Sequence, residues 1–161
     1  MAVLVHAGPG GGKVLLSAIM QAKVSIEILA YLFLSPRSLS GTGIMSEFFS
    51  TIVKKLTDGV YVSIVLNQKF PTGWMKKRVA DEFKRLSDAG VQIKWANPTR
   101  IQHAKILIVD RKTVYLGSVN LTTESFERNN EILLEIDDPI VVERCVEHFF
   151  NEQGNSKILA C

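Results

Sequence analysis

The sequence predicts a layered α/β sandwich in which helices flank a mixed, largely parallel central sheet. Short apolar, β-branched runs alternate along the chain with segments whose apolar residues recur at helical spacing, and this alternation is typical of layered α/β folds. The length of 161 residues fits one domain, and a hydrophobic content of 47% is ample for a core. We therefore expect a single domain spanning residues 1–161.

The N-terminal half alternates between the two patterns, with turn residues at the boundaries. The pair Asp58-Gly59, for example, is a helix-stop signal after a segment with helical apolar spacing. We expect, in order, a strand at 3–6, a Gly-rich turn at 8–12, a helix at 13–22, a strand at 24–33, a Ser/Gly/Pro loop at 34–43, a helix at 44–57 and a strand at 60–66.

The C-terminal half holds several strands close together in the sequence. Two of them, at 101–109 and 113–116, are separated by only a tight turn, so they add an antiparallel pair to the sheet. We expect, in order, a helix at 75–89 that Gly90 ends, a strand at 91–95, the strands at 101–109, 113–116 and 131–136, and a helix at 141–150.

Two polar side chains interrupt the apolar strand predicted at 101–109. Because side chains alternate across a strand, His103 and Lys105 share one face and Asp110 points to the other. Leaving such groups buried without a partner is costly, which favours an anion beside them. Lysine binds phosphate as a point charge, and histidine acts as a nucleophile or a proton carrier near neutral pH. We expect Asp110 to be a structural or orienting group that caps the turn at 110–112.

The following turn adds groups that suit a phosphate. Gly117 permits a close backbone approach, and Ser118 and Asn120 supply neutral hydrogen-bond donors. Glu131 lies at the mouth of the strand at 131–136, where a carboxylate can accept a hydrogen bond from a histidine and fix its tautomer. Each residue alone has an ordinary structural explanation, as a turn or a strand-end charge. Their joint occurrence in the order strand, turn, strand indicates a site.

The spacing of these residues resembles the HxKxxxxD signature of the phospholipase D superfamily, with its downstream Gly-Ser-x-Asn and late glutamate. The resemblance is most specific over 101–136. The stretch 14–33 is also similar to the opening helix and strand of small single-motif members, which are bacterial endonucleases and their mitochondrial-surface relatives. The resemblance implies a phospholipase D/nuclease-like catalytic domain over 1–161, with phosphodiester chemistry that needs no metal and no cofactor. Because that chemistry uses two motifs and this chain has one, it also implies a homodimer whose copies line one site.

The resemblance further assigns a role to each residue. His103 of one copy would attack phosphorus and form a phosphohistidine, while His103 of the other copy would protonate the leaving oxygen and then activate water. Lys105, Ser118 and Asn120 would bind the non-bridging oxygens. The implied catalytic set is His103, Lys105, Asn120 and Glu131, the last orienting the histidine, with Asp110 and Gly117 as structural or orienting residues and no metal ligand.

The charge distribution bears on the substrate. The net charge of +3 and the pI near 8.9 are weak indications of a nucleic-acid partner. The stretch 71–78 does not align with the relatives, and it combines Trp74 with three consecutive basic residues. A solvated helix face is the default interpretation of such a cluster, and contact with bases and phosphates is the alternative. If this stretch flanks the site, we expect it to alter substrate choice. Trp95, in the apolar run 91–95, is expected in the core instead.

Two other patterns do not indicate sites. Residues 8–13 superficially resemble a phosphate loop, but three residues rather than four separate the flanking glycines, and Val14 replaces the Ser or Thr that would hold magnesium. His6 and His148 do not lie at metal-ligand spacing from cysteines or carboxylates. We therefore expect neither a nucleotide site nor a metal site.

The sequence also bounds the compartment. No apolar run reaches the ~18–20 residues needed to cross a bilayer, and residues 1–12 lack the pattern of a signal peptide. Cys145 and Cys161 do not suggest a disulfide framework. A cytoplasmic location is the default expectation, and a removed leader or anchor is left open.

Three hypotheses for the function follow. The first is a metal-independent endonuclease that cleaves DNA or RNA as a homodimer. The second is hydrolysis or transfer at a phosphatidyl head group, which the same residues would serve, although the lack of an amphipathic membrane-binding segment favours nucleic acid. The third is a nucleic-acid-binding domain of a larger helicase, restriction or defence protein. The intact set of His103, Lys105, Asn120 and Glu131 argues against a purely binding role.

Overall fold

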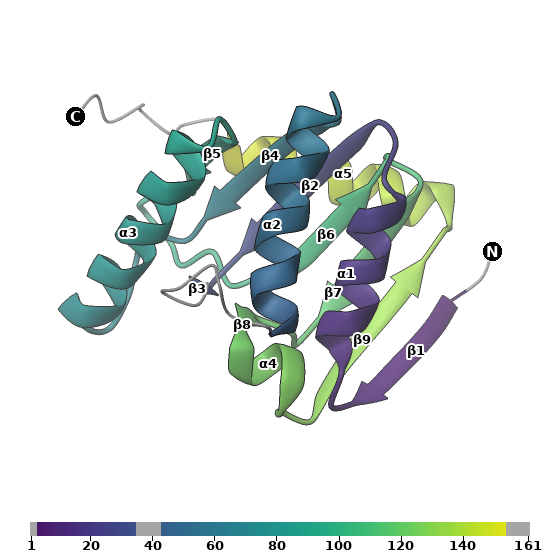
Figure 1. The fold of residues 1–161 in the computed structure, drawn as a ribbon, viewed down its shortest axis with the longest axis horizontal. Coiled ribbons are helices and arrows are strands. Elements are labelled where there is room, and N and C mark those ends of the chain that lie inside the picture. Colours follow the sequence, from purple (N-terminus) through teal and green to yellow (C-terminus); the bar gives the residue numbers. More distant parts are fainter. Residues whose placement is uncertain (1–2, 35–42, 154–161) are drawn as a thin grey trace.

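The computed structural model describes residues 3–34 and 43–153, and its strands form one large and one small sheet (Figure 1). The large sheet contains β1 (Val3–Gly8), β2 (Ser25–Ala30), β4 (Tyr61–Leu66), β5 (Gln92–Trp95), β6 (Ile106–Val109), β7 (Thr113–Gly117) and β9 (Glu131–Ile136). Their order across the sheet is β1-β9-β7-β6-β2-β4-β5. The small sheet pairs β3 (Phe33–Leu34) with β8 (Leu121–Thr122).

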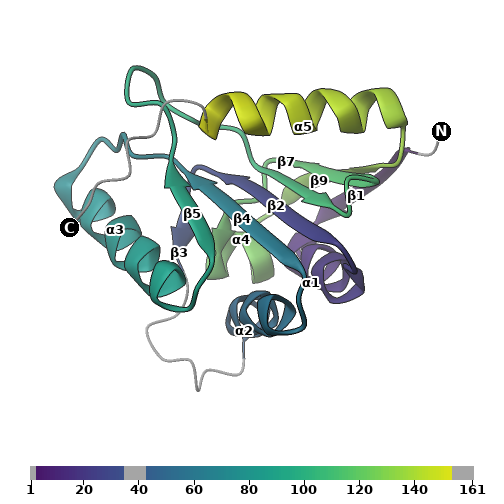
Figure 2. The same cartoon turned by 90° about the horizontal axis from the view of Figure 1, so that it is seen from above.

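Helices cover both faces of the large sheet. They are α1 (Gly11–Gln21), α2 (Ile44–Thr57), α3 (Gly73–Asp88), α4 (Thr123–Glu127) and α5 (Pro139–Gln153). Figure 2 shows α5 alone across one face, with α1 and α2 against the other and α3 beside β5 at one edge of the sheet. None of the helices in the described ranges is long and apolar enough to span a bilayer.

The predicted fold class is confirmed, but the sheet is not largely parallel. Only the pairs β2–β4 and β4–β5 are parallel, whereas β1–β9, β9–β7, β7–β6 and β6–β2 are antiparallel. The reason lies in the connections. The turn at 110–112 between β6 and β7 is too short for the crossover that a parallel pair requires. The alternation of strands and helices therefore predicts parallel pairing correctly only for β2, β4 and β5.

Most predicted elements are present with small shifts at their ends. The helix at 44–57 and the strand at 131–136 have the expected bounds. The strand expected at 24–33 divides into β2 and β3, and β8 and α4 had not been predicted. The loop expected at 34–43 lies almost wholly outside the described residues. The strand expected at 101–109 is regular only from Ile106, so His103 and Lys105 lie in an extended segment just before β6.

Apolar side chains fill both layers between sheet and helices. The alternation predicted for the segment before residue 110 holds within β6, because Leu107 and Val109 join the core under α1 and α2 while Ile106 and Ile108 face α5. Fully buried side chains in the larger core include Ile19, Met45, Phe48, Ile52 and Phe126, and those between the sheet and α5 include Leu29, Ile108 and, from α5 itself, Phe149.

Two glycines at the start of α1 serve packing. The Cβ of an alanine at Gly11 would lie 2.9 Å from the side chain of Val119, and one at Gly12 would overlap the ring of Phe126. Glycine is therefore needed where the start of α1 approaches Val119 and α4. This packing accounts for Gly11 and Gly12.

The order and direction of the strands bring one set of chain segments to the same end of the sheet. Strands β2, β4 and β7 end there, and β6 and β9, which run antiparallel to their neighbours, begin there. Tyr31 follows β2, Asn67 follows β4, Lys105 precedes β6, and Glu131 opens β9. We refer to this end as the site end.

Candidate active site

The segment that carries His103 is held by side-chain amides rather than by a strand ladder. Asn67 is fully buried, and its Oδ1 accepts a hydrogen bond from the backbone N–H of Gln102 at 3.1 Å. The Gln102 side chain in turn binds both backbone groups of Ala104, accepting from its N–H at 2.5 Å and donating to its carbonyl at 3.2 Å. These contacts fix the backbone on both sides of His103 without covering its imidazole.

The imidazole of His103 is exposed and packs against an aromatic ring that the sequence analysis did not assign to the site. Its ring centroid lies 4.4 Å from that of Tyr31, and Tyr31 lies 5.6 Å from Phe70. Tyr31 directly follows the buried strand β2, one residue after its carboxyl end. The sequence could have indicated Tyr31 as a site residue, because it is a polar aromatic residue at the end of an apolar strand.

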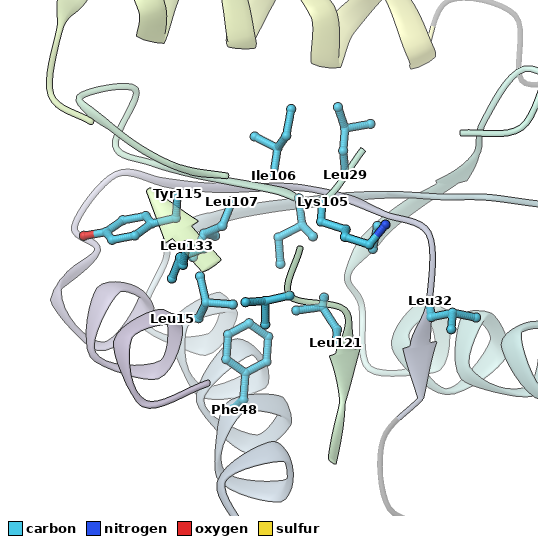
Figure 3. A pocket seen from close by; sticks show the side chains of 13 residues that line it. Leu15, Leu29, Leu32, Phe48, Lys105, Ile106, Leu107, Tyr115, Leu121 and Leu133 are labelled. Carbon is cyan, nitrogen blue, oxygen red and sulfur yellow. The ribbon is translucent and has the colours of Figure 1, made fainter. Parts of the chain in front are cut away.

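Lys105 lies beside His103 and covers an apolar cavity. Its Nζ donates to the carbonyl of His103 at 2.8 Å, lies 3.4 Å from the ring nitrogen Nδ1, and is 5.3 Å from the centroid of the Tyr31 ring. Its stem lines an apolar cavity of about 20 Å³ together with Leu15, Phe48 and Leu121. Figure 3 shows Ile106 and Leu29 pointing the other way, toward α5. Burial lowers the pKa of the Lys105 ammonium, and Glu131 opposes this effect.

Glu131 lies on the other side of Lys105 and is 9% exposed. It accepts hydrogen bonds from the hydroxyl of Ser118 and, at 3.3 Å, from the amide of Asn129. Burial acts to raise the pKa of Glu131, but hydrogen bonds from Ser118, Ser125 and Asn129, together with the charge of Lys105, hold it below its ordinary value of 4.5. Within the described residues of one copy, His103 is not a hydrogen-bond partner of Glu131.

The turn after β7 supplies one unpaired polar group. The side-chain oxygen Oδ1 of Asn120 is buried and has no hydrogen-bond partner among the described residues. Such an atom costs free energy unless a partner satisfies it. Ser118 is already engaged, because its Oγ also accepts from the backbone N–H of Ile132 at 3.0 Å. A Cβ on Gly117 would overlap the Ile132 carbonyl, so this glycine permits the close approach of β7 and β9.

Asp110 lies at the opposite end of β6 from His103 and binds backbone groups of another segment. Its carboxylate accepts hydrogen bonds from the N–H groups of Lys23, Val24 and Ser25 at 3.0, 2.7 and 2.9 Å. Asp110 itself has a positive φ of 54°. The contacts therefore join the turn after β6 to the start of β2. They support a structural role for Asp110, at a distance from any substrate bound at the site end.

Asp110→Ala is expected to lower the free energy of unfolding by about 2 kcal/mol, because three charge-assisted hydrogen bonds are lost. Burial acts to raise the pKa of Asp110, but the N–H groups of Ser25, Val24 and Lys23 and the charge of Lys112 hold it below its ordinary value of 3.8. The native state therefore favours the ionised form. The stabilisation is fully present above that ordinary value and is lost as the pH falls through the folded pKa.

Urea unfolding of the wild type and of Asp110→Ala between pH 7 and pH 2 measures this contribution. The difference between the two proteins should shrink as the pH drops below about 4. Lys77→Ala, at an exposed position on α3 away from this turn, is the control, and it should change stability little. A constant difference across the whole pH range would contradict the assigned role of Asp110.

Other polar candidates lie outside this constellation. The ring nitrogen Nε2 of His6 is 2.9 Å from Glu135, and His148 is exposed on α5. Trp95 stacks on Phe83 at 4.5 Å and packs against the core, as predicted. In the described ranges, no group of three or more His, Cys, Asp or Glu residues is arranged to hold a metal ion. The site end therefore combines an imidazole, an ammonium, a side-chain amide whose N–H can donate, and a carboxylate, a set suited to binding and attacking a phosphodiester.

Comparisons with known proteins agree with this chemistry. Residues 15–152 match the family described as cardiolipin synthase, PLD-like domain. The mitochondrial cardiolipin hydrolase of Canis lupus familiaris is 27% identical over 135 residues, which are 84% of this chain and 47% of that protein. A phospholipase D of Rickettsia typhi is 23% identical over 150 residues, covering 92% of this chain and 66% of that protein. The chain thus spans about half the length of the cardiolipin hydrolases that it matches.

Solved structures share the fold. The phospholipase D family member Nuc from Salmonella typhimurium superposes with a TM-score of 0.77 at 29% sequence identity, covering 97% of this chain and 96% of that chain. NucT from Helicobacter pylori superposes with a TM-score of 0.73 at 18% identity, covering 96% of this chain and 97% of that chain, which shows a common fold.

Proposed function

Because this chain belongs to the phospholipase D family, we propose that it is a metal-independent phosphodiesterase that cleaves the nucleic-acid backbone at a site shared by two copies. The observation that carries the proposal is the pairing of the exposed His103 imidazole with the Lys105 ammonium, 3.4 Å apart, at the site end. A nucleophile beside a fixed cation is what attack on a phosphodiester requires, since negative charge grows on the phosphate oxygens in the transition state.

The reaction proceeds in two displacements. A ring nitrogen of one His103 forms a bond to phosphorus as the bond from phosphorus to the leaving oxygen breaks, and the second copy's histidine gives its proton to that oxygen. This second histidine then takes a proton from water, whose oxygen displaces the first imidazole from phosphorus. The Lys105 ammonium and the side-chain N–H of Asn120 donate to the non-bridging oxygens, and Ser118 lies beside them at the rim.

A second copy would supply two things that the site of one copy lacks, a second histidine and an imidazole for Glu131 to orient. The reaction needs a nucleophile and a proton donor, and each chain supplies a single histidine in the motif. Glu131 is buried and ionised beside Lys105, yet it makes no hydrogen bond to the histidine of its own chain. In the proposed dimer, a two-fold axis would bring one copy's carboxylate within reach of the other copy's imidazole, where it would orient the ring.

Nucleic acid is favoured over lipid by the surface around the site. Exposed basic residues and an exposed tryptophan lie on α3, and the described helices present no broad apolar face that could enter a membrane surface. The near-complete overlap with Nuc in both chains also supports the nuclease hypothesis over the lipid one. Lipid hydrolysis remains the second candidate, because several matched relatives are named as cardiolipin hydrolases and the same residues would serve it.

A substrate panel in excess EDTA tests the proposal. The panel contains labelled single-stranded DNA, duplex DNA, RNA and cardiolipin vesicles, each incubated with the wild-type protein. Cleavage of a nucleic acid that EDTA does not inhibit is the expected result. Hydrolysis of cardiolipin alone would favour the second candidate, and no turnover of any phosphodiester by a folded dimer would contradict both.

A further inference from the structure

One aromatic side chain on α3 is unusually accessible. Trp74 is 63% exposed, whereas the other tryptophan, Trp95, is stacked on Phe83 and half-buried. Large aromatic side chains are usually buried or in contact with a partner, so an exposed one draws attention to its surface. The neighbouring Thr72 caps the helix by accepting from the N–H of Met75 at 3.3 Å, which fixes the backbone that carries Trp74.

Three basic residues follow this tryptophan in α3, and one of them contacts its ring. Lys76, Lys77 and Arg78 follow it within the first two turns of α3, and the first turn contains no acidic residue. The Arg78 guanidinium lies 5.8 Å from the centroid of the Trp74 ring. Among the residues that the structure describes, neither Lys76 nor Lys77 forms an ion pair with a carboxylate. We call this set, Trp74 with Lys76, Lys77 and Arg78, the Trp74 surface.

The Trp74 surface lies near the reacting groups. A row of aromatic contacts leads from His103 through Tyr31 to Phe70, and Trp74 is four residues after Phe70 in the sequence. Four residues span at most about 14 Å, so Trp74 lies within that distance of Phe70, the outer ring of this row. Figure 1 shows that α3 begins at the end of the sheet where β4 finishes, which is the site end.

The rest of α3 argues against a membrane contact. Val79 and Leu86 are fully buried, and Phe83 is packed against Trp95. The apolar side of the helix is therefore used by the core, and Trp74 is a lone exposed aromatic residue among cations. Insertion into a bilayer surface needs a continuous apolar face, whereas a single ring beside cations suits one base and its flanking phosphates.

We propose that the Trp74 surface binds an unpaired strand next to the scissile phosphate, with Trp74 stacked on a base and Lys76 and Lys77 contacting phosphates. The inference rests on the proposed function and names its substrate class: single-stranded nucleic acid. Bases stacked within a duplex do not offer a free face to a side chain, whereas an unpaired strand does. Arg78 supports the ring from the protein side through its contact with Trp74.

The test measures binding rather than turnover. A labelled single-stranded oligonucleotide and its duplex are titrated by fluorescence anisotropy into protein that carries His103→Ala, so that neither is cleaved. Adding Trp74→Ala is expected to raise Kd for the single strand by about 5- to 150-fold and Kd for the duplex by much less. Trp74→Phe should recover part of the affinity, and Ile140→Ala, which removes another exposed apolar side chain, should change neither constant.

The lysines are tested through the salt dependence of binding. Lys76→Gln with Lys77→Gln should reduce the slope of log Kd against log salt by about 1.4 for the single strand, since each phosphate contact contributes about 0.7. Lys23→Gln with Lys112→Gln is the matched control at the opposite end of the sheet, and the slope should not change.

The outcomes separate this inference from the proposed function. Three results would each overturn the inference. They are an equal loss of affinity for the single strand and the duplex, unchanged affinity in Trp74→Ala, and a requirement for Trp74 in binding anionic phosphatidylserine vesicles instead of the oligonucleotide. Cleavage by the wild-type protein is scored separately. If the wild-type protein hydrolyses no phosphodiester, the proposed function is refuted. A selective loss of single-strand binding in Trp74→Ala would still support the Trp74 surface.

Discussion

His103→Ala is expected to lower kcat for phosphodiester cleavage by at least about 10⁴-fold, because each shared site loses both its nucleophile and its proton donor. The imidazole is exposed, and its backbone is held by Asn67 and Gln102, so the substitution leaves the core intact. The measurement is single-turnover cleavage at saturating enzyme, together with circular dichroism to show that the variant is folded.

Two further results sharpen this prediction. Substrate labelled at the scissile phosphate should leave label on the wild-type protein after rapid quenching, and none on His103→Ala. The control is His148→Ala, which removes an exposed imidazole on α5 and should retain full activity. A His103→Ala protein that keeps more than about one hundredth of the wild-type kcat would contradict the role of nucleophile.

Lys105→Met is expected to lower kcat by about 10²- to 10³-fold, with a smaller change in KM. Methionine retains the apolar stem that lies along the cavity, so the fall in kcat measures the effect of the ammonium charge rather than of packing. The charge acts mainly in the transition state, where it faces the growing negative charge on the phosphate oxygens. Lys112→Met is the matched control in an exposed turn. A rise in KM with unchanged kcat would show that Lys105 only binds the ground state.

The alkaline side of the rate profile gives an independent check on Lys105. Burial lowers the pKa of its ammonium below the ordinary 10.5, so the charged form is lost at a lower pH than for an exposed lysine. With an aryl phosphodiester, whose leaving group needs no proton from the second histidine, activity should therefore begin to decline below that value. A guanidinium stays charged throughout this range, and Lys105→Arg should move the decline to higher pH even if its rate is lower.

The sequence was sufficient to predict the elements whose ends coincide with local signals. The helix at 44–57 ends at Asp58-Gly59, and the strand at 131–136 is an apolar run between polar residues, so both bounds were confirmed. The order of the predicted strand at 101–109, the following turn and the strand at 131–136 also predicted that His103, Lys105 and Glu131 would lie at one site. The structure places all three at the site end.

Features set by contacts between distant segments could not be predicted. The backbone at 101–105 departs from a strand because Asn67, some 35 residues away, binds Gln102 in place of a neighbouring strand. Tyr31 reaches His103 only because β2 and β6 are neighbours, which the periodicity of either segment does not reveal. The direction of each strand likewise depends on connections that hydrophobic patterning does not encode, and so the share of parallel pairing was overestimated.

The shared site is the central claim, and a mixed dimer tests it most directly. Wild-type and His103→Ala chains with different affinity tags are produced together, and the pair that carries both tags is isolated. Each such pair has one intact motif histidine. If two copies complete one site, the mixed pair should be nearly as inactive as the His103→Ala dimer. Activity of about half that of the wild-type dimer would mean that each chain carries its own complete site, and it would contradict the account.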